Sequence, residues 1–349
     1  MTVFNKEIKI GNFLIAEDSD AFVIAEAGVN HQGNIEIAKK LIDIAAESGA
    51  NAVKFQAFKT EELILRGVPK APYQLKTTDA EGSQFEMLKK LEINREKIIE
   101  LKKYCERRDI IFLITPFDEM SLEELDEIDI AAYKIASTDL TNLLFLNKVA
   151  KKKKPIILST GMSYLAEVEM ALGEIHPYNK DVVLLQCTAN YPVKDNEVNL
   201  NVIPRYKSFF NMLVGYSDHS VGIGATPYAV AMGARVVEKH FTVDKSMEGP
   251  DHKASLDPYE LREFIKEIRR VRKYLGVSHK LPSISELETR KSLQKNLVAA
   301  RDIKKGELFS EDTLIAKRTG GIGISPLYYK DVTGKYASRD FRKDEIIEI

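Results

Sequence analysis

The sequence predicts a (β/α)8 barrel followed by a small β-rich domain, and three observations lead to this prediction. From residue 21 to residue 276, short apolar runs alternate with amphipathic stretches, which is the pattern of strands and helices in turn. Eight such runs occur, the number that a closed barrel of about 250 residues requires. The sequence lacks the Gly-rich phosphate loops that are typical of open doubly wound sheets.

Each predicted strand coincides with one apolar run. The eight runs are Phe22–Glu26, Ala52–Phe55, Ile110–Thr115, Ala131–Ile135, Pro155–Ser159, Val182–Gln186, Met212–Gly215 and Ala234–Glu238. The stretches between them carry apolar residues three or four positions apart, as helices that cover a barrel do. One stretch, residues 59–103, is too long for a single helix and contains Pro69, Pro72 and Gly82. We therefore expect an extended loop over the barrel mouth.

The pattern changes after Gly276, where a polar and charged stretch precedes short, turn-rich strand segments. We expect a barrel domain over residues 1–276, a linker over 277–295 and a second domain over 296–349. In the second domain the sequence Arg-Asp-Ile-Lys-Lys-Gly-Glu at 301–307 recurs as Arg-Asp-Phe-Arg-Lys-Asp-Glu at 339–345. This repeat predicts a pseudo-symmetric β module that is too short to be a solenoid.

Composition and charge restrict the class of partner. The 349 residues contain 51 Lys+Arg and 52 Asp+Glu, so no net field would attract nucleic acid or an acidic membrane. The two cysteines, Cys105 and Cys187, lack metal-type spacing, and the N-terminus lacks the apolar core of a signal peptide. No apolar run reaches the roughly 20 residues that span a bilayer. We expect a cytoplasmic protein that acts on small molecules.

Polar residues end the otherwise apolar strands, at the edge where the catalytic groups of such barrels lie. In chain order they are Glu26, Lys54 and Gln56, Thr115, Lys134 and Ser137, Ser159 and Thr160, Ser217 to His219, and Glu238 to His240. Strand ends are solvated in any barrel, which accounts for each residue singly. Solvation at strand ends does not explain two lysines inside a barrel, because a buried ammonium requires an anionic partner. The set predicts a pocket for a phosphate or carboxylate.

His219 and His240 end neighbouring strands about 4.8 Å apart, so both imidazoles can reach one metal ion at ~2.1 Å. Two ligands leave the rest of the coordination shell to water or substrate, which suits Mn2+ or Mg2+ better than structural zinc. The spacing alone also fits two hydrogen-bonded structural histidines. We expect Cys187, beyond the sixth strand, to be a packing residue rather than a nucleophile.

Eight short motifs accompany these strand ends. They are Ile-Ala-Glu-Ala-Gly-Val-Asn-His at 24–31, Ala-Val-Lys-Phe-Gln at 52–56, Thr-Pro-Phe at 115–117, Tyr-Lys-Ile-Ala-Ser at 133–137, Leu-Ser-Thr-Gly-Met at 158–162, Gly-Tyr-Ser-Asp-His at 215–219, Glu-Lys-His-Phe-Thr at 238–242 and Gly-Pro-Asp-His-Lys-Ala-Ser at 249–255. As an ordered set they closely resemble the N-acetylneuraminate synthase family, which includes the legionaminic and pseudaminic acid synthases. The C-terminal residues, with Lys317-Arg318 and the loop 320–326, resemble the antifreeze-like (SAF) domain of that family.

The resemblance implies that phosphoenolpyruvate condenses with an N-acylated amino sugar and water to give a nine-carbon keto acid and phosphate. It also implies that His219 and His240 bind a divalent metal, most simply Mn2+ with Mg2+ or Co2+ as alternatives, which activates the sugar aldehyde. Glu26 and Asp139 join these histidines as implied catalytic residues. The implied phosphoenolpyruvate pocket consists of Lys54, Thr115, Lys134, Ser137, Ser159, Asn190 and Ser217. The residues implied to face the sugar are Glu26, Tyr191, Asp251 and Arg318.

Arg318 matches an arginine that in this family enters the active site of the partner subunit, so the resemblance implies a domain-swapped homodimer. Three positions depart from the family pattern. Ala189, next to Asn190, stands where some members have asparagine, and Asp139 replaces a glutamate. Thr319 replaces the proline that usually follows the arginine. These departures concern the phosphate contacts, proton transfer and the loop that presents Arg318.

Other functions remain open at this point. A metal-independent aldolase would form a Schiff base through Lys54 or Lys134, because the barrel desolvates both. A carbohydrate-binding protein would use the C-terminal domain and would not need lysines in the barrel. For the resembled family, the sugar is either N-acetylmannosamine, which gives sialic acid, or a diacetamido-deoxyhexose, which gives legionaminic or pseudaminic acid. The motif at 249–255 favours the sialic and legionaminic members.

Overall fold

The computed structural model describes residues 3–70, 75 and 82–349. The chain divides into two compact units, residues 1–276 and 277–349. The first unit contains a closed barrel, and the second contains a two-stranded antiparallel sheet with short helices. Within the described part of the chain, no helix combines the length and the apolar character needed to cross a membrane.

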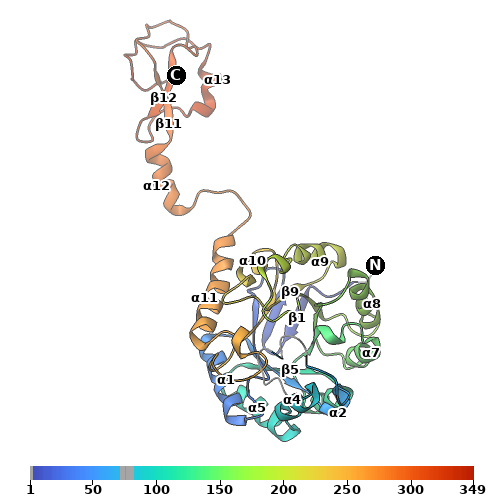
Figure 1. Cartoon of the computed structure of the whole chain (residues 1–349). Helices are drawn as coiled ribbons and strands as arrows, with labels where there is room; N and C mark the ends of the chain where they lie inside the picture. The colour runs from blue at the N-terminus through green and yellow to red at the C-terminus, as the bar shows by residue number, and fades with distance from the viewer. Residues whose placement is uncertain (1–2, 71–74, 76–81) are drawn as a thin grey trace. The chain divides into compact units, whose positions relative to one another are not determined.

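The eight predicted strands form one closed parallel barrel, which confirms the predicted fold (Figure 1). In chain order they are β3 (Phe22–Gly28), β4 (Ala52–Ala57), β5 (Ile111–Pro116), β6 (Tyr133–Ile135), β7 (Ile156–Ser159), β8 (Val182–Cys187), β9 (Val214–Asp218) and β10 (Val236–His240). Each strand pairs with the next along the chain, and β10 closes the ring on β3. The last two strands continue beyond their predicted ends, to Asp218 and His240, because polar side chains do not interrupt the backbone ladder.

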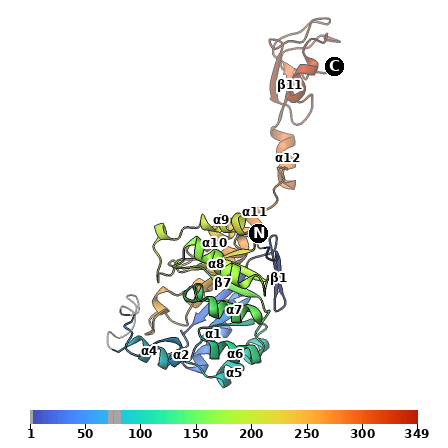
Figure 2. The same ribbon diagram turned by 90° about the vertical axis from the view of Figure 1, so that its right-hand side faces the viewer.

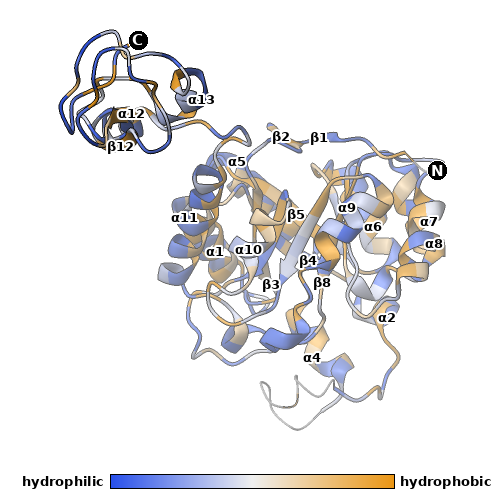
Figure 3. Ribbon diagram, turned by 90° about the horizontal axis from the view of Figure 1, so that it is seen from above, coloured by the Kyte–Doolittle hydropathy of each residue, from blue (hydrophilic) through white to orange (hydrophobic). Residues whose placement is uncertain are grey.

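Helices cover the outside of the barrel (Figure 2). They are α1 (Ile35–Ser48), α5 (Arg95–Arg107), α6 (Glu119–Ile128), α7 (Leu143–Lys151), α8 (Leu165–Ile175), α9 (Val202–Phe210), α10 (Thr226–Ala231) and α11 (Pro258–Leu275). Local sequence sets their limits: the Asn34 side chain accepts two backbone N–H bonds to start α1, and Gly49 ends it at φ 85°. In Figure 3 the strands are largely orange and α11 is largely blue, so the apolar residues gather at the centre of the unit.

Inward-facing residues change from apolar to polar along the barrel strands. Residues two apart on a strand share a face, and the lower inward layer belongs to one buried apolar cluster. Its members on the strands are Ile24, Ala52, Leu113, Ile157, Leu185 and Val236, and Ala132 directly precedes β6. Two residues further along the same strands stand Glu26, Lys54, Thr115, Lys134, Ser159, Cys187 and Glu238. The lower half of the barrel therefore supplies a core, and the upper half supplies polar groups.

An N-terminal hairpin closes the lower end of the barrel. Its strands, β1 (Glu7–Ile10) and β2 (Phe13–Ala16), pair antiparallel. Ile8, Ile10 and Ile15 are buried in the same cluster as the lower inward layer. This hairpin precedes the predicted strands and was not predicted from the sequence. The sequence does carry the pattern of a hairpin, because Ile8 and Ile10 alternate with polar residues before a Gly-Asn turn at 11–12.

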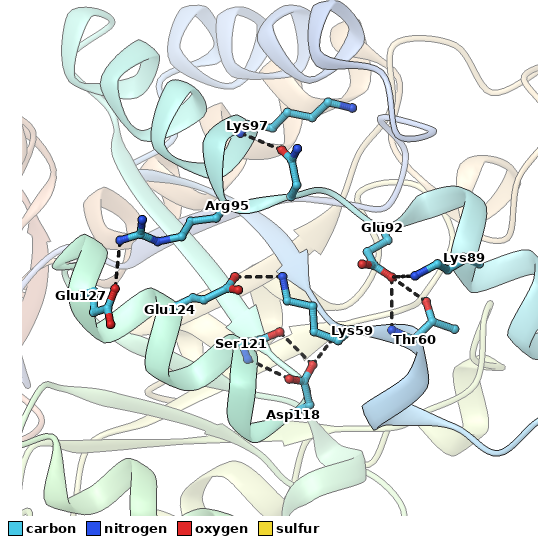
Figure 4. Close-up of polar contacts among 11 residues, drawn as sticks. Lys59, Thr60, Lys89, Glu92, Arg95, Lys97, Asp118, Ser121, Glu124 and Glu127 are labelled. Carbon is cyan, nitrogen blue, oxygen red and sulfur yellow. Dashed lines mark hydrogen bonds and ion pairs between the residues drawn. The ribbon is translucent and has the colours of Figure 1, made fainter.

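The long segment between β4 and β5 contains α2 (Thr60–Leu63), α4 (Gln84–Leu91) and α5. Polar contacts hold its start in place (Figure 4). The Lys59 backbone N–H donates to the Asp118 carboxylate at 2.8 Å, and the Thr60 hydroxyl donates to Glu92 at 3.0 Å. The middle of the expected loop, including Pro72, lies outside the described residues.

The second unit contains α12 (Ile284–Leu293), β11 (Lys295–Ala299), β12 (Leu314–Arg318) and α13 (Tyr329–Val332). The two copies of its internal repeat face each other. Ile303 and Phe341 exchange backbone hydrogen bonds of 2.9 Å. Asp302 accepts a 2.8 Å bond from the Lys343 N–H of the other copy, and Asp340 accepts the equivalent 2.8 Å bond from Lys305. The unit thus has the pseudo-symmetry that the repeat predicts.

Candidate active site

Two lysines and two glutamates form a row of buried ion pairs at the carboxyl ends of the strands. The Lys54 ammonium nitrogen lies 2.9 Å from Glu26 and 3.6 Å from Glu238. The Lys134 ammonium nitrogen lies 3.5 Å from Glu238. All four residues are at most 4% exposed. Buried charges are tolerated when they are paired, so these contacts explain how the barrel interior holds two ammonium groups.

The two glutamates titrate very differently although both are buried. Burial raises the pKa of Glu26 to about 7, because the neighbouring Lys54 only partly offsets the loss of solvent. Burial also favours a higher pKa at Glu238, but Lys134 and Lys54 together outweigh it and hold this pKa at about 2. Glu26 can therefore hold or release a proton near neutral pH, whereas Glu238 stays ionised.

Hydroxyl groups surround this row. Thr115 accepts a 3.2 Å bond from Lys54, and Ser217 donates a 3.1 Å bond to Glu238. Ser137 accepts a 2.8 Å bond from the Gly161 N–H in the loop after β7. The Ser159 hydroxyl is buried and has no hydrogen-bond partner among the residues that the structure describes. A buried donor of this kind is available to a ligand oxygen.

The two histidines lie beside this row. Nδ1 of His219 is 2.8 Å from the Thr188 carbonyl oxygen, which only accepts, so Nδ1 carries a proton. Burial favours a lower pKa at His219, but Cys187 and the Thr188 carbonyl outweigh it and raise this pKa. Burial holds the pKa of His240 well below its ordinary value, so this ring is neutral. The ring centroids of the two histidines are 5.6 Å apart, and the Tyr191 ring lies 4.0 Å from that of His219.

These donors fit an open metal site. His240 Nδ1 is buried without a hydrogen bond and lies 3.8 Å from the Asp251 carboxylate. Among the described residues, no group of three His, Cys, Asp or Glu side chains could hold an ion by itself. Two imidazole ligands would leave most coordination positions to substrate and water, as catalytic ions require and structural zinc does not.

The remaining predicted residues lie in different surroundings. Burial raises the pKa of Asp251 to about 6. The Asp139 carboxylate accepts 3.2 Å bonds from Thr138 and Asn142, at the start of α7. Asn190 is exposed and lies 3.4 Å from Glu197. Arg318 belongs to the second unit, where it ends β12 and is exposed.

Glu238 ends a predicted strand but is not among the site residues predicted from the sequence. The structure places its carboxylate between the two lysines. The signal was available, because a barrel with two inward lysines needs more than one inward carboxylate, and Glu238 is inward by the two-residue period.

The fold and these residues define a (β/α)8-barrel protein with a buried pair of lysines beside two imidazoles at the carboxyl ends of its strands. Comparison with known proteins is consistent with this class. A model described as the NeuB family matches residues 41–280, and a SAF domain model matches residues 296–348. The chain belongs to the NeuB family.

Individual relatives cover nearly the whole chain. An N,N'-diacetyllegionaminic acid synthase of Campylobacter jejuni is 48% identical over 328 residues, which are 93% of this chain and 98% of that protein. The human N-acetylneuraminate-9-phosphate synthase is 35% identical over 328 residues, 93% of this chain and 91% of that protein. A crystal structure of the N-acetylneuraminic acid synthetase from Leptospira borgpetersenii, in complex with citrate, has a TM-score of 0.73 at 35% identity and covers 84% of this chain and 99% of that one.

Proposed function

We propose that this protein condenses phosphoenolpyruvate with an N-acylated amino sugar. The enol carbon of phosphoenolpyruvate forms a bond to the aldehyde carbon of the open-chain sugar. Water then adds to the neighbouring carbon, and the tetrahedral product expels phosphate, so that three reactants give one nine-carbon keto acid and phosphate. The observation that carries the proposal is the buried Lys54–Glu238–Lys134 arrangement beside two imidazoles.

The lysines serve as the receptor for phosphoenolpyruvate. This substrate carries a phosphate and a carboxylate, and two ammonium groups on neighbouring parts of the barrel wall match that charge pattern. The Ser159 hydroxyl, which is buried without a partner in the described structure, can donate to a substrate oxygen. Holding two substrates in attack geometry can contribute roughly 7 to 11 kcal/mol to the barrier reduction.

His219 and His240 would hold a divalent ion such as Mn2+, with Mg2+ or Co2+ as alternatives, which when bound supplies Lewis-acid polarisation of the sugar aldehyde. Glu26 is the nearby carboxyl group with a pKa of about 7. It can therefore give a proton to the oxygen that becomes a hydroxyl, or take one from the attacking water. Tyr191 and Asp251 lie against the histidines and would contact the sugar.

The sugar that we favour is a diacetamido-deoxyhexose, with N-acetylmannosamine as the alternative. Identity to the legionaminic acid synthase of C. jejuni is 48%, against 35% to the human N-acetylneuraminate-9-phosphate synthase over the same length of alignment. The product would then be a legionaminic acid rather than sialic acid. Because phosphoenolpyruvate is a cytoplasmic metabolite, the proposal places the protein in the cytoplasm.

Phosphate release from phosphoenolpyruvate tests the reaction and the sugar together. Chelator-treated protein is incubated with phosphoenolpyruvate and one sugar at a time, with and without Mn2+. The sugars are the diacetamido-deoxyhexoses of the legionaminic and pseudaminic series and N-acetylmannosamine. We expect release that requires both Mn2+ and sugar and is fastest with the legionaminic precursor. Lys54→Met should abolish release, whereas Lys154→Met, which changes a partly exposed lysine paired with Asp129, should not. Absence of turnover with every sugar would contradict the proposal.

A Schiff-base aldolase is the competing mechanism, and burial lowers the pKa of Lys134, as an imine-forming lysine requires. Borohydride treatment in the presence of pyruvate separates the two mechanisms. We expect no covalent adduct by mass spectrometry. An adduct on either barrel lysine, combined with activity that survives chelation, would replace our mechanism with the aldolase.

We also propose a homodimer in which Arg318 of the partner subunit completes the sugar site. Its support is the exposure of this arginine at the end of β12 and the match of the second unit to the SAF domain. The His219→Ala and Arg318→Ala variants should each be inactive. When their subunits are mixed and re-associated, part of the activity should return, because one site of each mixed dimer combines an intact His219 with an intact Arg318. Mixtures that stay inactive, or a fully active monomer in light scattering, would rule out the exchange.

A further inference from the structure

A second buried ion pair lies outside the row of lysines and glutamates. Asp218 and Lys239 are paired across β9 and β10, with the carboxylate 3.2 Å from the ammonium nitrogen, and each residue is 1% exposed. Their neighbours Ser217 and Glu238 face the barrel interior and bond to each other. By the alternation of side chains along a strand, Asp218 and Lys239 face outward, toward the layer that the helices cover.

The ion pair holds the loop that follows β9. The Asp218 carboxylate accepts bonds from the Ser220 N–H at 2.8 Å, from the Ser220 hydroxyl and from the Thr226 hydroxyl at 2.6 Å. The Lys239 ammonium donates to the Ser220 carbonyl. The loop closes tightly over the pair at Gly224, where φ is +63° and a Cβ atom would lie 2.0 Å from the Ser220 hydroxyl oxygen and 3.1 Å from the ammonium nitrogen.

The position of this network relates directly to the two histidines. His219 lies between Asp218 and Ser220, and the Lys239 ammonium contacts both of those neighbours. His240 directly follows Lys239 in β10. One ammonium group therefore contacts the residues on both sides of His219, through the Asp218 carboxylate and the Ser220 carbonyl, and belongs to the residue immediately before His240.

We propose that the Asp218–Lys239 pair, with Ser220 and Thr226, is a positioning device that sets the separation and orientation of His219 and His240 and thereby the affinity for the divalent ion. The inference rests on the proposed function, because it takes these two histidines as metal ligands. A buried ion pair contributes little net stability compared with apolar residues of equal size. Its directional bonds do fix geometry, which two metal ligands on separate strands require.

Thr226 offers the sharpest test, since its hydroxyl bonds the Asp218 carboxylate and it is not among the residues proposed to bind the metal ion or the substrates. Thr226→Val keeps the shape and removes one hydrogen bond to Asp218, whereas Thr226→Ser keeps the hydroxyl. The Mn2+ dissociation constant of the full-length protein is measured by calorimetry and by electron paramagnetic resonance. We expect about tenfold weaker binding for Thr226→Val, the low end of the 10- to 100-fold effects of residues that orient metal ligands, and binding within about twofold of the wild type for Thr226→Ser.

Arg269→Met is the matched control for a loss of stability alone. Arg269 is partly buried and donates to the Ala21 carbonyl and the Asn51 side chain, at the opposite ends of the strands. It should lower the melting temperature and leave the Mn2+ dissociation constant unchanged. If Thr226→Val behaves in the same way, the positioning role is wrong although the metal assignment stands. If the wild-type protein binds no Mn2+, the metal assignment falls, and the positioning role falls with it.

Discussion

Replacing Glu238 by glutamine should destabilise the ligand-free protein. It should also increase the rise in melting temperature that added phosphate causes. Within the described part of the chain, Glu238 is the only carboxylate within 4 Å of Lys134, whereas Lys54 also contacts Glu26 at 2.9 Å. Glu238→Gln therefore leaves one fully buried ammonium without a counter-charge. Removing one partner of a buried pair lowers the free energy of unfolding by about 3 to 5 kcal/mol. We expect a loss near the low end, because Lys54 keeps Glu26 and only Lys134 is left without a carboxylate.

The expected loss is measurable by thermal unfolding. At roughly 2 °C per kcal/mol for a domain of this size, a loss of about 3 kcal/mol corresponds to about 6 °C. Inorganic phosphate can supply the missing negative charge, so its addition should raise the melting temperature of Glu238→Gln by more than that of the wild type. Adding Lys134→Met to this variant should restore most of the stability, because no unpaired charge then remains.

Glu123→Gln removes a surface partner of Lys152, in a pair whose carboxylate is 61% exposed. Pairs of that kind contribute about 0.2 to 1 kcal/mol, so this variant should unfold close to the wild-type temperature. The reasoning is refuted if Glu238→Gln unfolds together with Glu123→Gln, or if phosphate stabilises Glu238→Gln no more than the wild type.

Three further predictions concern the hairpin, the second unit and its loop. Ile10→Ala should lower the free energy of unfolding by about 2 to 5 kcal/mol in chemical denaturation, and a loss below 1 kcal/mol would mean that the hairpin does not seal the barrel. Asp302→Ala should speed hydrogen exchange of the Lys343 amide and Asp340→Ala that of the Lys305 amide, with a slightly larger effect for Asp340→Ala because Asp340 also pairs with Lys304; unchanged exchange in either variant would contradict the structural role of these contacts. Thr319→Val should increase amide exchange across residues 319–322, because the Thr319 hydroxyl bonds both the side chain of Asn296 and the Ile322 carbonyl; unchanged exchange would show that these bonds do not order the loop.

The barrel could be predicted from the sequence because its strands are short, apolar and separated by helical patterns. The position of the two lysines was also predictable: Lys54 and Lys134 lie in barrel strands beside several hydroxyl residues, and the structure buries both in the barrel. The hairpin was overlooked because two strands of four residues carry too weak a pattern when they are read apart from the barrel that they seal.

The pairing among site residues could not be predicted from strand ends alone. Glu238, Lys239 and His240 are consecutive, yet Glu238 joins the inner row and Lys239 joins the outer ion pair. Sequence gives the alternation of faces but not the partner across the barrel, because that depends on how eight strands are staggered around the ring. The different pKa directions of Glu26 and Glu238 follow from those partners, so they too required the structure.

The change from an apolar lower layer to a polar upper layer takes place within a step of two residues on most of the strands. Substitutions in the two layers therefore have separate consequences. A change at Ile24 or Leu113 alters packing and leaves the chemistry in place, while a change at Glu26 or Thr115 alters the chemistry above an intact core. Uncharged residues of the upper layer can therefore be exchanged one at a time above an intact core, whereas the paired charges of that layer have to change together.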